Sequence, residues 1–164
     1  MAKTTTISVR VPEGTRDWLE RRTHKMGTAG SAAARILEES RRRESFRGVE
    51  FRDTPDGRIA IVSETRVPVH LFARSVRDQK GRLDEVASHC CWLLWKVESA
   101  WAYAEAFPEE MAEDDRTFDA QHRAIARAID EEDGEGAAAA MARHLTTVLS
   151  RYMETGDDED SNVS

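Results

Sequence analysis

The sequence predicts a mostly α-helical protein with short β-strands, and three observations lead to this prediction. The segment Thr5–Pro12 alternates apolar and polar side chains, as a short strand does. Asp56-Gly57 separates two runs of β-forming residues, which predicts a hairpin. Most of the remaining chain repeats apolar residues at helical spacing. The predicted elements group into four parts: residues 1–47, 48–114, 115–153 and 154–164.

The first predicted element is the strand Thr5–Pro12. Its isoleucine and valines fall on one face, and its polar side chains fall on the other. A single strand of this length is not stable alone, so we expect it to pair with the same strand of a second copy. The ribbon formed in this way would present a face of hydroxyl and guanidinium groups. The side chains on that face are Thr6, Ser8 and Arg10.

Two helices are predicted after the strand. Pro12 ends the strand, and apolar residues from Trp18 onward continue at near-helical spacing until Gly27 provides a stop. A second helix is expected from about Ser31, with a small apolar stripe suited to packing against a symmetry mate. Thr28 and Ser31 are both candidates to cap this helix.

In this order of elements, residues 1–47 resemble the ribbon-helix-helix (CopG/Arc-type) repressors. The matching pieces are the ISVRVPE core, the Met-Gly turn and the S-x-x-x-R-I-L run. The resemblance implies a homodimer, formed through the N-terminal strand, that binds a double-stranded DNA operator. It also implies base contacts from the ribbon and phosphate binding at the start of the second helix. The residues implied in DNA binding are Thr6, Ser8, Arg10, Thr28 and Ser31. The alternative is an ordinary β-α-α fragment of a larger domain.

Charge is divided unevenly along the chain. The whole sequence carries a net charge of −7, which taken alone disfavours binding to nucleic acid. Residues 1–47, however, hold 11 Lys and Arg against six Asp and Glu, a net charge of +5, so the remainder carries −12. A basic N-terminal part can attract phosphates, while an acidic body avoids them or meets a basic partner. The cluster Arg41–Arg43 either contacts phosphates or only complements a helix end.

Residues 48–114 are predicted to form a hairpin followed by helices. The strands flank Thr54-Pro55-Asp56-Gly57. Three helices are expected, at about 69–78, 83–89 and 94–106, and Pro108 is expected to end the last helix and begin a short turn. Adjacent Cys90 and Cys91 are poorly spaced for a disulfide or a metal site, so we expect buried thiols.

These residues resemble the domain of unknown function 433, whose members are small hairpin-plus-helices modules often encoded beside PIN-like ribonuclease toxins. The matching motifs are FRD with GR, TRVPV, LDEVA, V-x-x-A-x-x-Y and FPEE. The sequence departs from the family at Cys90–Trp95, where the extra tryptophans are either core or a partner surface. The helices around this turn also look like a helix-turn-helix. The second helix, however, offers Trp101, Tyr103 and Glu105, so we expect a packing or partner module.

Residues 115–153 are predicted to form a helical hairpin interrupted near Asp133-Gly134. The pattern around His122 and His144 resembles the closing helices of the FCD ligand-binding domain of GntR-type regulators, in which such a His pair helps to hold a metal. Two histidines alone do not form a divalent-metal site, so we expect no metal and no cofactor. We expect an oligomerising or partner-gripping hairpin, and metal binding at His122 and His144 is the alternative. The acidic residues 154–164 are expected to form a solvated, disordered tail.

Several classes of protein are disfavoured by what the sequence lacks. No phosphate-binding glycine loop, nucleophile elbow or spaced metal motif is present, so we expect no enzyme. No apolar run has membrane-spanning length and no secretory signal is visible, so we expect a cytoplasmic protein that does not contact membranes.

Two functions remain. The first is an antitoxin-type autorepressor of a toxin-antitoxin system, which binds its own operator as a dimer and neutralises a protein toxin, expected to be a ribonuclease. The alternative is a ligand- or metal-responsive transcription factor whose C-terminal helices act as the sensor.

Overall fold

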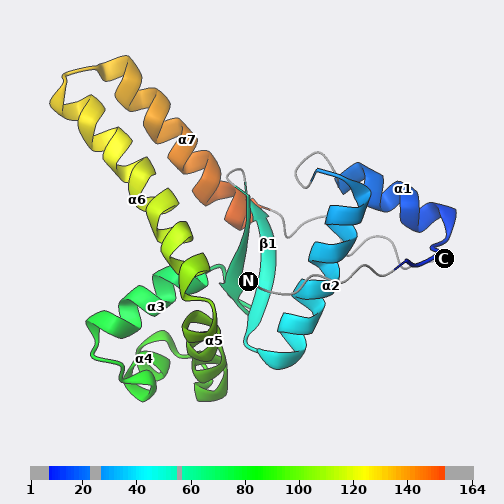
Figure 1. Ribbon diagram of the computed structural model, residues 1–164. Helices are drawn as coiled ribbons and strands as arrows, with labels where there is room; N and C mark the ends of the chain where they lie inside the picture. Colours follow the sequence, from blue (N-terminus) through cyan, green and yellow to red (C-terminus); the bar gives the residue numbers. More distant parts are fainter. Residues whose placement is uncertain (1–7, 23–26, 55–56, 154–164) are drawn as a thin grey trace, which may run out of the picture. The chain divides into compact units, whose positions relative to one another are not determined.

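A computed structural model describes the backbone of residues 8–22, 27–54 and 57–153, and side chains as far as residue 146. Within these ranges the chain forms seven helices and one two-stranded sheet (Figure 1), which confirms the predicted mostly α-helical class with short β-strands. It divides into two compact units, Met1–Arg42 and Arg43–Ser164. In the described residues, no helix is long and apolar enough to cross a membrane.

The first unit contains α1 (Glu13–Arg22) and most of α2 (Ala29–Ser45). The carbonyl oxygen of Pro12 accepts the first hydrogen bonds of α1, and Glu13 places a negative charge at the positive end of that helix. Gly27 has a φ of +84°, a conformation that glycine adopts without strain, so the predicted stop glycine precedes α2. Two helices therefore follow one another, as predicted.

The predicted N-terminal strand is only partly within the described residues. Thr5, Thr6 and Ile7 lie outside them, and the segment from Ser8 to Pro12 is irregular and exposed in this single chain. Such a strand needs a second copy to supply its hydrogen-bond partners. The intermolecular ribbon therefore stays a prediction.

The second unit begins with an antiparallel hairpin of β1 (Val49–Thr54) and β2 (Gly57–Val62). Val49 pairs with Val62 and Thr54 pairs with Gly57, so two residues connect the strands at the predicted turn. Val49, Ala60 and Val62 are buried and belong to the hydrophobic core. The predicted hairpin is confirmed.

Three helices follow: α3 (Val69–Asp78), α4 (Leu83–Cys90) and α5 (Leu94–Ala106). Their bounds agree with the predicted bounds to within one residue. The apolar stripe of α3 packs on β2 and α5, and one face of α5, which includes Val97, Ala100 and Tyr103, is fully buried. Besides the hairpin residues, the buried core includes Phe72, Val76, Val86, Val97, Ala100, Tyr103 and Met111.

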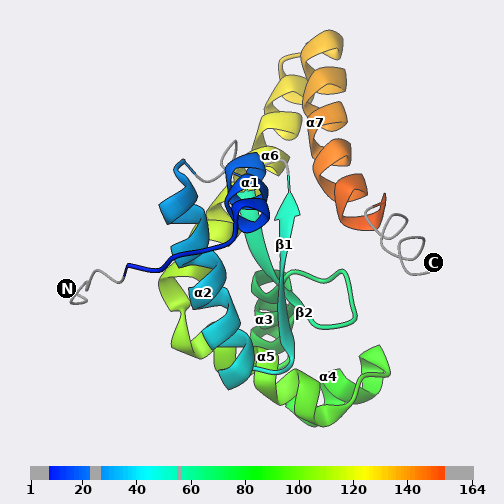
Figure 2. The ribbon, with the colours of Figure 1, turned by 90° about the vertical axis from the view of Figure 1, so that its right-hand side faces the viewer.

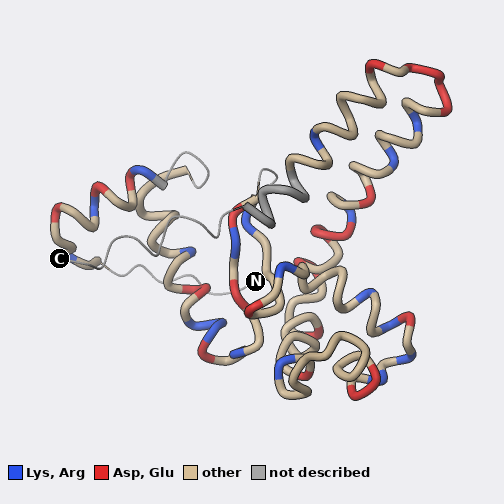
Figure 3. Tube along the Cα trace, turned by 180° about the vertical axis from the view of Figure 1, so that it is seen from behind, with Lys and Arg blue, Asp and Glu red and all other residues tan. Residues whose placement is uncertain are grey.

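A long helical hairpin completes the unit, formed by α6 (Pro108–Asp130) and α7 (Gly134–Met153), which lie side by side (Figures 1 and 2). Pro108 occupies the first turn, where its missing N–H costs nothing, so the predicted short turn is in fact the start of a continuous helix. The predicted boundary between residues 114 and 115 therefore falls inside α6. The turn between the helices is strongly acidic (Figure 3).

The turn between α4 and α5 differs in part from expectation. Cys90 and Cys91 are both free, but Cys91 is exposed, so the prediction of buried thiols is wrong for that residue. It occupies the left-handed position that ends α4, with a φ of 56°. Trp92 packs against the core beside Phe72, whereas Trp95 keeps 48% of its surface exposed. The tryptophans therefore divide between core and surface.

Candidate functional site

The predicted DNA-binding residues of the N-terminal segment are exposed where the structure describes them. Ser8 and Arg10 lie in the irregular segment before α1, and both are exposed. Thr6 lies outside the described residues. The side chains of Ser8 and Arg10 are thus accessible in this chain, and base contact by all three residues stays a prediction.

The other two predicted residues meet at the start of α2. The Ser31 N–H donates to the Thr28 hydroxyl oxygen at 3.2 Å, and the two hydroxyl oxygens are 3.0 Å apart. Thr28 is therefore the residue that caps α2, and Ser31 lies in its first turn. This first turn carries no acidic residue, so α2 places no like charge near an anion at its N-terminus.

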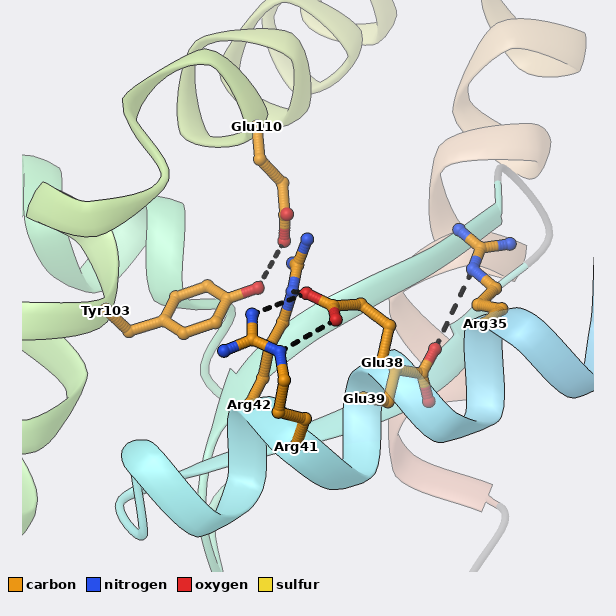
Figure 4. A network of polar contacts seen from close by, with 7 residues as sticks. All are labelled: Arg35, Glu38, Glu39, Arg41, Arg42, Tyr103 and Glu110. Atoms are coloured by element: carbon orange, nitrogen blue, oxygen red, sulfur yellow. Dashed lines mark hydrogen bonds and ion pairs between the residues drawn. The ribbon is translucent and has the colours of Figure 1, made fainter. Parts of the chain in front are cut away.

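The basic cluster of the first unit is partly neutralised within its own helix (Figure 4). Arg41 donates to both oxygens of Glu38, at 2.9 and 2.7 Å, and Arg42 donates to it at 2.9 Å. These hydrogen bonds lower the pKa of Glu38 to about 2. Glu38 therefore competes with any phosphate for the same two guanidinium groups.

The same figure shows a separate contact inside the second unit. The Tyr103 hydroxyl donates to the Glu110 carboxylate at 2.6 Å, and the Tyr103 side chain is otherwise fully buried. This bond joins α5 to the first turn of α6. The start of the helical hairpin formed by α6 and α7 is thereby fixed to the core.

The two histidines of the helical hairpin face each other. The rings of His122 and His144 have centroids 4.5 Å apart. His122 Nδ1 lies 3.0 Å from the Phe118 carbonyl oxygen, and His144 Nδ1 lies 3.2 Å from Gln121 Oε1. Across the described side chains, no group of three or more His, Cys, Asp or Glu residues could hold a metal. The pair thus connects α6 to α7 through ring and hydrogen-bond contacts.

A third histidine, which the sequence did not single out, lies in the core of this unit. His70 on α3 is only 2% exposed. Its ring lies 6.0 Å from that of Phe118, and its Nδ1 is 3.9 Å from an oxygen of Asp114 on α6. In the sequence His70 is a single polar residue between Val69 and Leu71, and that pattern contains no signal for its neighbours on α6.

These residues border a cavity of about 190 Å³ between the hairpin, α3 and α6. Its wall includes Arg58 from β2, His70 from α3, and Asp114, Phe118 and Gln121 from α6. A second hollow of about 370 Å³ lies between α6 and α7 and shares Gln121 and Thr117 with the first. One face of α6 thus borders both spaces. We call the first of them the His70 cavity.

Comparison with known proteins gives one result. Residues 86–147 match the family model of the FCD domain, a stretch that runs from α4 into α7. The match covers less than half of the chain, and it begins earlier than the closing helices in which the sequence showed a resemblance. It does not reach the N-terminal residues or the β-hairpin. No curated protein and no solved structure matches the chain.

Proposed function

We propose that this protein is a ligand-responsive transcriptional regulator. The observation that carries the proposal is the FCD match over α4 to α7, since FCD domains occur as C-terminal domains of GntR-family regulators. The basic charge of residues 1–47 and their predicted ribbon-helix-helix organisation support a DNA-binding role for the N-terminal part. No catalytic step is part of the proposal.

In this mechanism the N-terminal parts of two chains form the DNA-binding dimer, and the FCD-like helices bind an effector. A ligand changes DNA affinity only if it binds more tightly to one of two conformations. The coupling between effector and operator is reciprocal, so operator DNA changes effector affinity by the same factor. Effector binding should therefore be measurable with and without DNA.

The DNA-binding part is tested by a footprint on the promoter of the gene itself, followed by Arg10→Ala. If Arg10 makes a bidentate base contact, the change should weaken the free energy of binding to the specific operator by about 1–3 kcal/mol and weaken binding to random DNA less. Arg123→Ala, an exposed change on α6, is the control and should leave both affinities unchanged. Equal losses on the two DNAs for Arg10→Ala would contradict the assignment.

An antitoxin-type repressor is the second candidate. It is motivated by the resemblance of residues 48–114 to the domain of unknown function 433, and the hairpin and three helices predicted there from turn and periodicity signals are compatible with such a module. The charge of −12 outside residues 1–47 also suits a basic, RNA-cutting partner. Co-purification with the product of an adjacent gene, and inhibition of its nuclease activity, would select this function over the first.

A further inference from the structure

We propose that the hollow between α6 and α7 binds a small organic anion, namely a carboxylate with a compact aliphatic body. We call this hollow of about 370 Å³ the Arg143 groove. Its wall consists of four residues of α6 and two of α7, which are Thr117, Ala120, Gln121, Ala124, Ala140 and Arg143. Such a ligand would be the effector of the regulator proposed above, so its biological use rests on that function. Binding itself depends only on the second unit, in which this wall lies.

Arg143 supplies the charge of the groove. It is the one charged side chain among the described residues of the wall, and it is exposed. Within the part of the chain that the structure describes, it makes no ion pair and no side-chain hydrogen bond. By contrast, Arg74 and Arg116 each pair with a carboxylate. A ligand carboxylate would therefore bind Arg143 without displacing an internal partner.

The sequence explains why α7 gives Arg143 no partner. The positions three and four residues before and after it, which lie next to it on the helix surface, hold only alanine and threonine. Glu135 is the nearest acidic residue of α7 toward the turn, eight positions away or about 12 Å along a helix. At physiological ionic strength, exposed charges at that distance are largely screened. The positive charge of Arg143 is thus not cancelled within its own helix.

Thr117 adds a hydrogen-bond donor from the opposite helix. Its hydroxyl lines the groove and makes no hydrogen bond to another described residue. A carboxylate accepts several hydrogen bonds at its two oxygens, so the guanidinium and the hydroxyl can hold it together. An anion held through a metal fits less well, because the described side chains contain no group of three or more potential metal ligands.

The rest of the wall favours an aliphatic body. Ala120 and Ala124 contribute methyl groups from α6, and Ala140 of α7, which is only 6% exposed, borders the same space. The described residues of the wall include no aromatic ring. A cavity of about 150 Å³ is enough to hold benzene, so about 370 Å³ has room for one ring with a carboxylate attached. Burial of the carbon atoms of the ring against these methyl groups contributes the apolar part of the affinity.

The groove lies where a ligand can change the packing of the helical hairpin. Thr117 and Gln121 belong to α6 and Arg143 to α7, so one ligand contacts both helices. Gln121 also joins the two helices directly, since its side-chain oxygen is 3.2 Å from His144 Nδ1. A ligand that bridges α6 and α7 stabilises the conformation in which they have this separation. A preference of this kind for one conformation is what a regulator requires.

The first experiment uses the full-length wild-type protein, a metal chelator and three probes that share one ring: cyclohexanecarboxylate, cyclohexylmethanol and cyclohexylmethylammonium. Calorimetry and protein-observed NMR should show the tightest binding for the carboxylate and the weakest for the ammonium ion, with shifts of the Ala124 and Ala140 methyl groups. Equal affinity for the three probes, preference for the ammonium ion, or shifts confined to other residues would overturn the proposal. Absence of carboxylate binding in the presence of the chelator would overturn it as well.

The second experiment alters the groove itself. Arg143→Gln removes the charge and should weaken the carboxylate about fivefold or more, while the alcohol is unaffected. Arg123→Gln, the same change at an exposed position of α6 outside the wall, is the matched control and should bind as wild type. Ala124→Leu fills the groove and should weaken the carboxylate and the alcohol alike. Because Arg143 and Ala124 are both exposed, neither change disturbs the core. Retention of full carboxylate affinity in either groove variant would refute the site.

The result is separable from the fate of the proposed function. Carboxylate binding without any effect on operator affinity would leave the site intact and count against the regulator. Operator binding that responds to other small molecules, with no carboxylate binding, would leave the regulator intact and eliminate this groove as an anion site.

Discussion

At the scale of single residues, Glu38 shows how a local ion cluster can limit a surface that the sequence marks as basic. The run of three arginines at the end of α2 suggested phosphate contacts. The structure places a carboxylate one turn earlier, and it accepts hydrogen bonds from Arg41 and Arg42. The net charge that this part of α2 offers to a polyanion is therefore smaller than the count of arginines indicates.

This cluster predicts a specific dependence on pH. The pKa of Glu38 falls from 4.5 to about 2 in the folded chain. Its contribution to the free energy of unfolding is therefore fully present above pH 4.5 and is lost as the pH falls through about 2. Because the Glu38 side chain is 42% exposed, we expect this ion cluster to contribute only about 0.5 kcal/mol to stability. NMR titration of the Glu38 carboxyl should give the low midpoint.

The control for this prediction lies in the same helix. The double change of Arg41→Gln and Arg42→Gln should move the Glu38 midpoint back toward its ordinary value, since it replaces both charged guanidinium donors by neutral amides. Arg43→Gln, one position further, should leave the midpoint unchanged. A normal midpoint in the unaltered protein would show that the cluster is absent in solution.

At the scale of elements, the close approach of the hairpin to α5 depends on one glycine. A Cβ at Gly48 would lie 2.6 Å from the Lys96 carbonyl oxygen and 2.8 Å from the Ser99 Cβ. The Gly48 N–H also donates to the Ser99 hydroxyl at 2.9 Å. Backbone atoms cannot move away as a flexible side chain does, so any larger residue must separate the strand from the helix.

Gly48→Ala should therefore destabilise the second unit by about 1–3 kcal/mol, the usual cost of forced overpacking. Thermal and denaturant unfolding, followed by tryptophan fluorescence, measure this change. Gly134→Ala is the matched control, because the added Cβ meets no atom within 4 Å beyond its chain neighbours and the backbone of its own helix, and it should leave stability unchanged or slightly raise it. Equal stability of the two variants would contradict the packing described here.

The ends of helices show which local features the sequence indicates and which it does not. Gly27 was recognised as a stop between the first two helices, whereas Pro108 was expected to begin only a short turn and in fact begins α6. Three helices, α3, α4 and α6, are followed by left-handed residues that are not glycine: Lys80, Cys91 and Glu132. In each case two backbone N–H groups bond back into the last turn of the helix, and these bonds hold the strained residue in place.

At the scale of the whole molecule, the chain consists of two units of different character. Among its described residues the first unit buries only two apolar side chains, Leu19 and Ala32, whereas the second contains the contiguous core. A unit with so little burial needs additional contacts to be stable, and the predicted dimer through the N-terminal strand would supply them.

This difference predicts the behaviour of fragments. Residues 43–164 should fold alone and unfold cooperatively, since they contain the whole described core. Residues 1–47 should gain helicity with rising peptide concentration, because folding is coupled to dimerisation. Circular dichroism and sedimentation measure both properties. An unfolded 43–164 fragment, or helicity of residues 1–47 that does not depend on concentration, would contradict this division.

The sequence by itself determined the periodic elements: the hairpin around Asp56-Gly57, the helices α3 to α5 and the helical content of the last part. Their signals are local, because alternation, helical spacing and turn residues act over a few positions. Only the tertiary structure decided which side chains meet. His70 and Asp114 are 44 positions apart, and the neighbours of a buried polar residue depend on how helices pack rather than on any nearby sequence pattern. For that reason the elements were predictable, while the cavity between them was not.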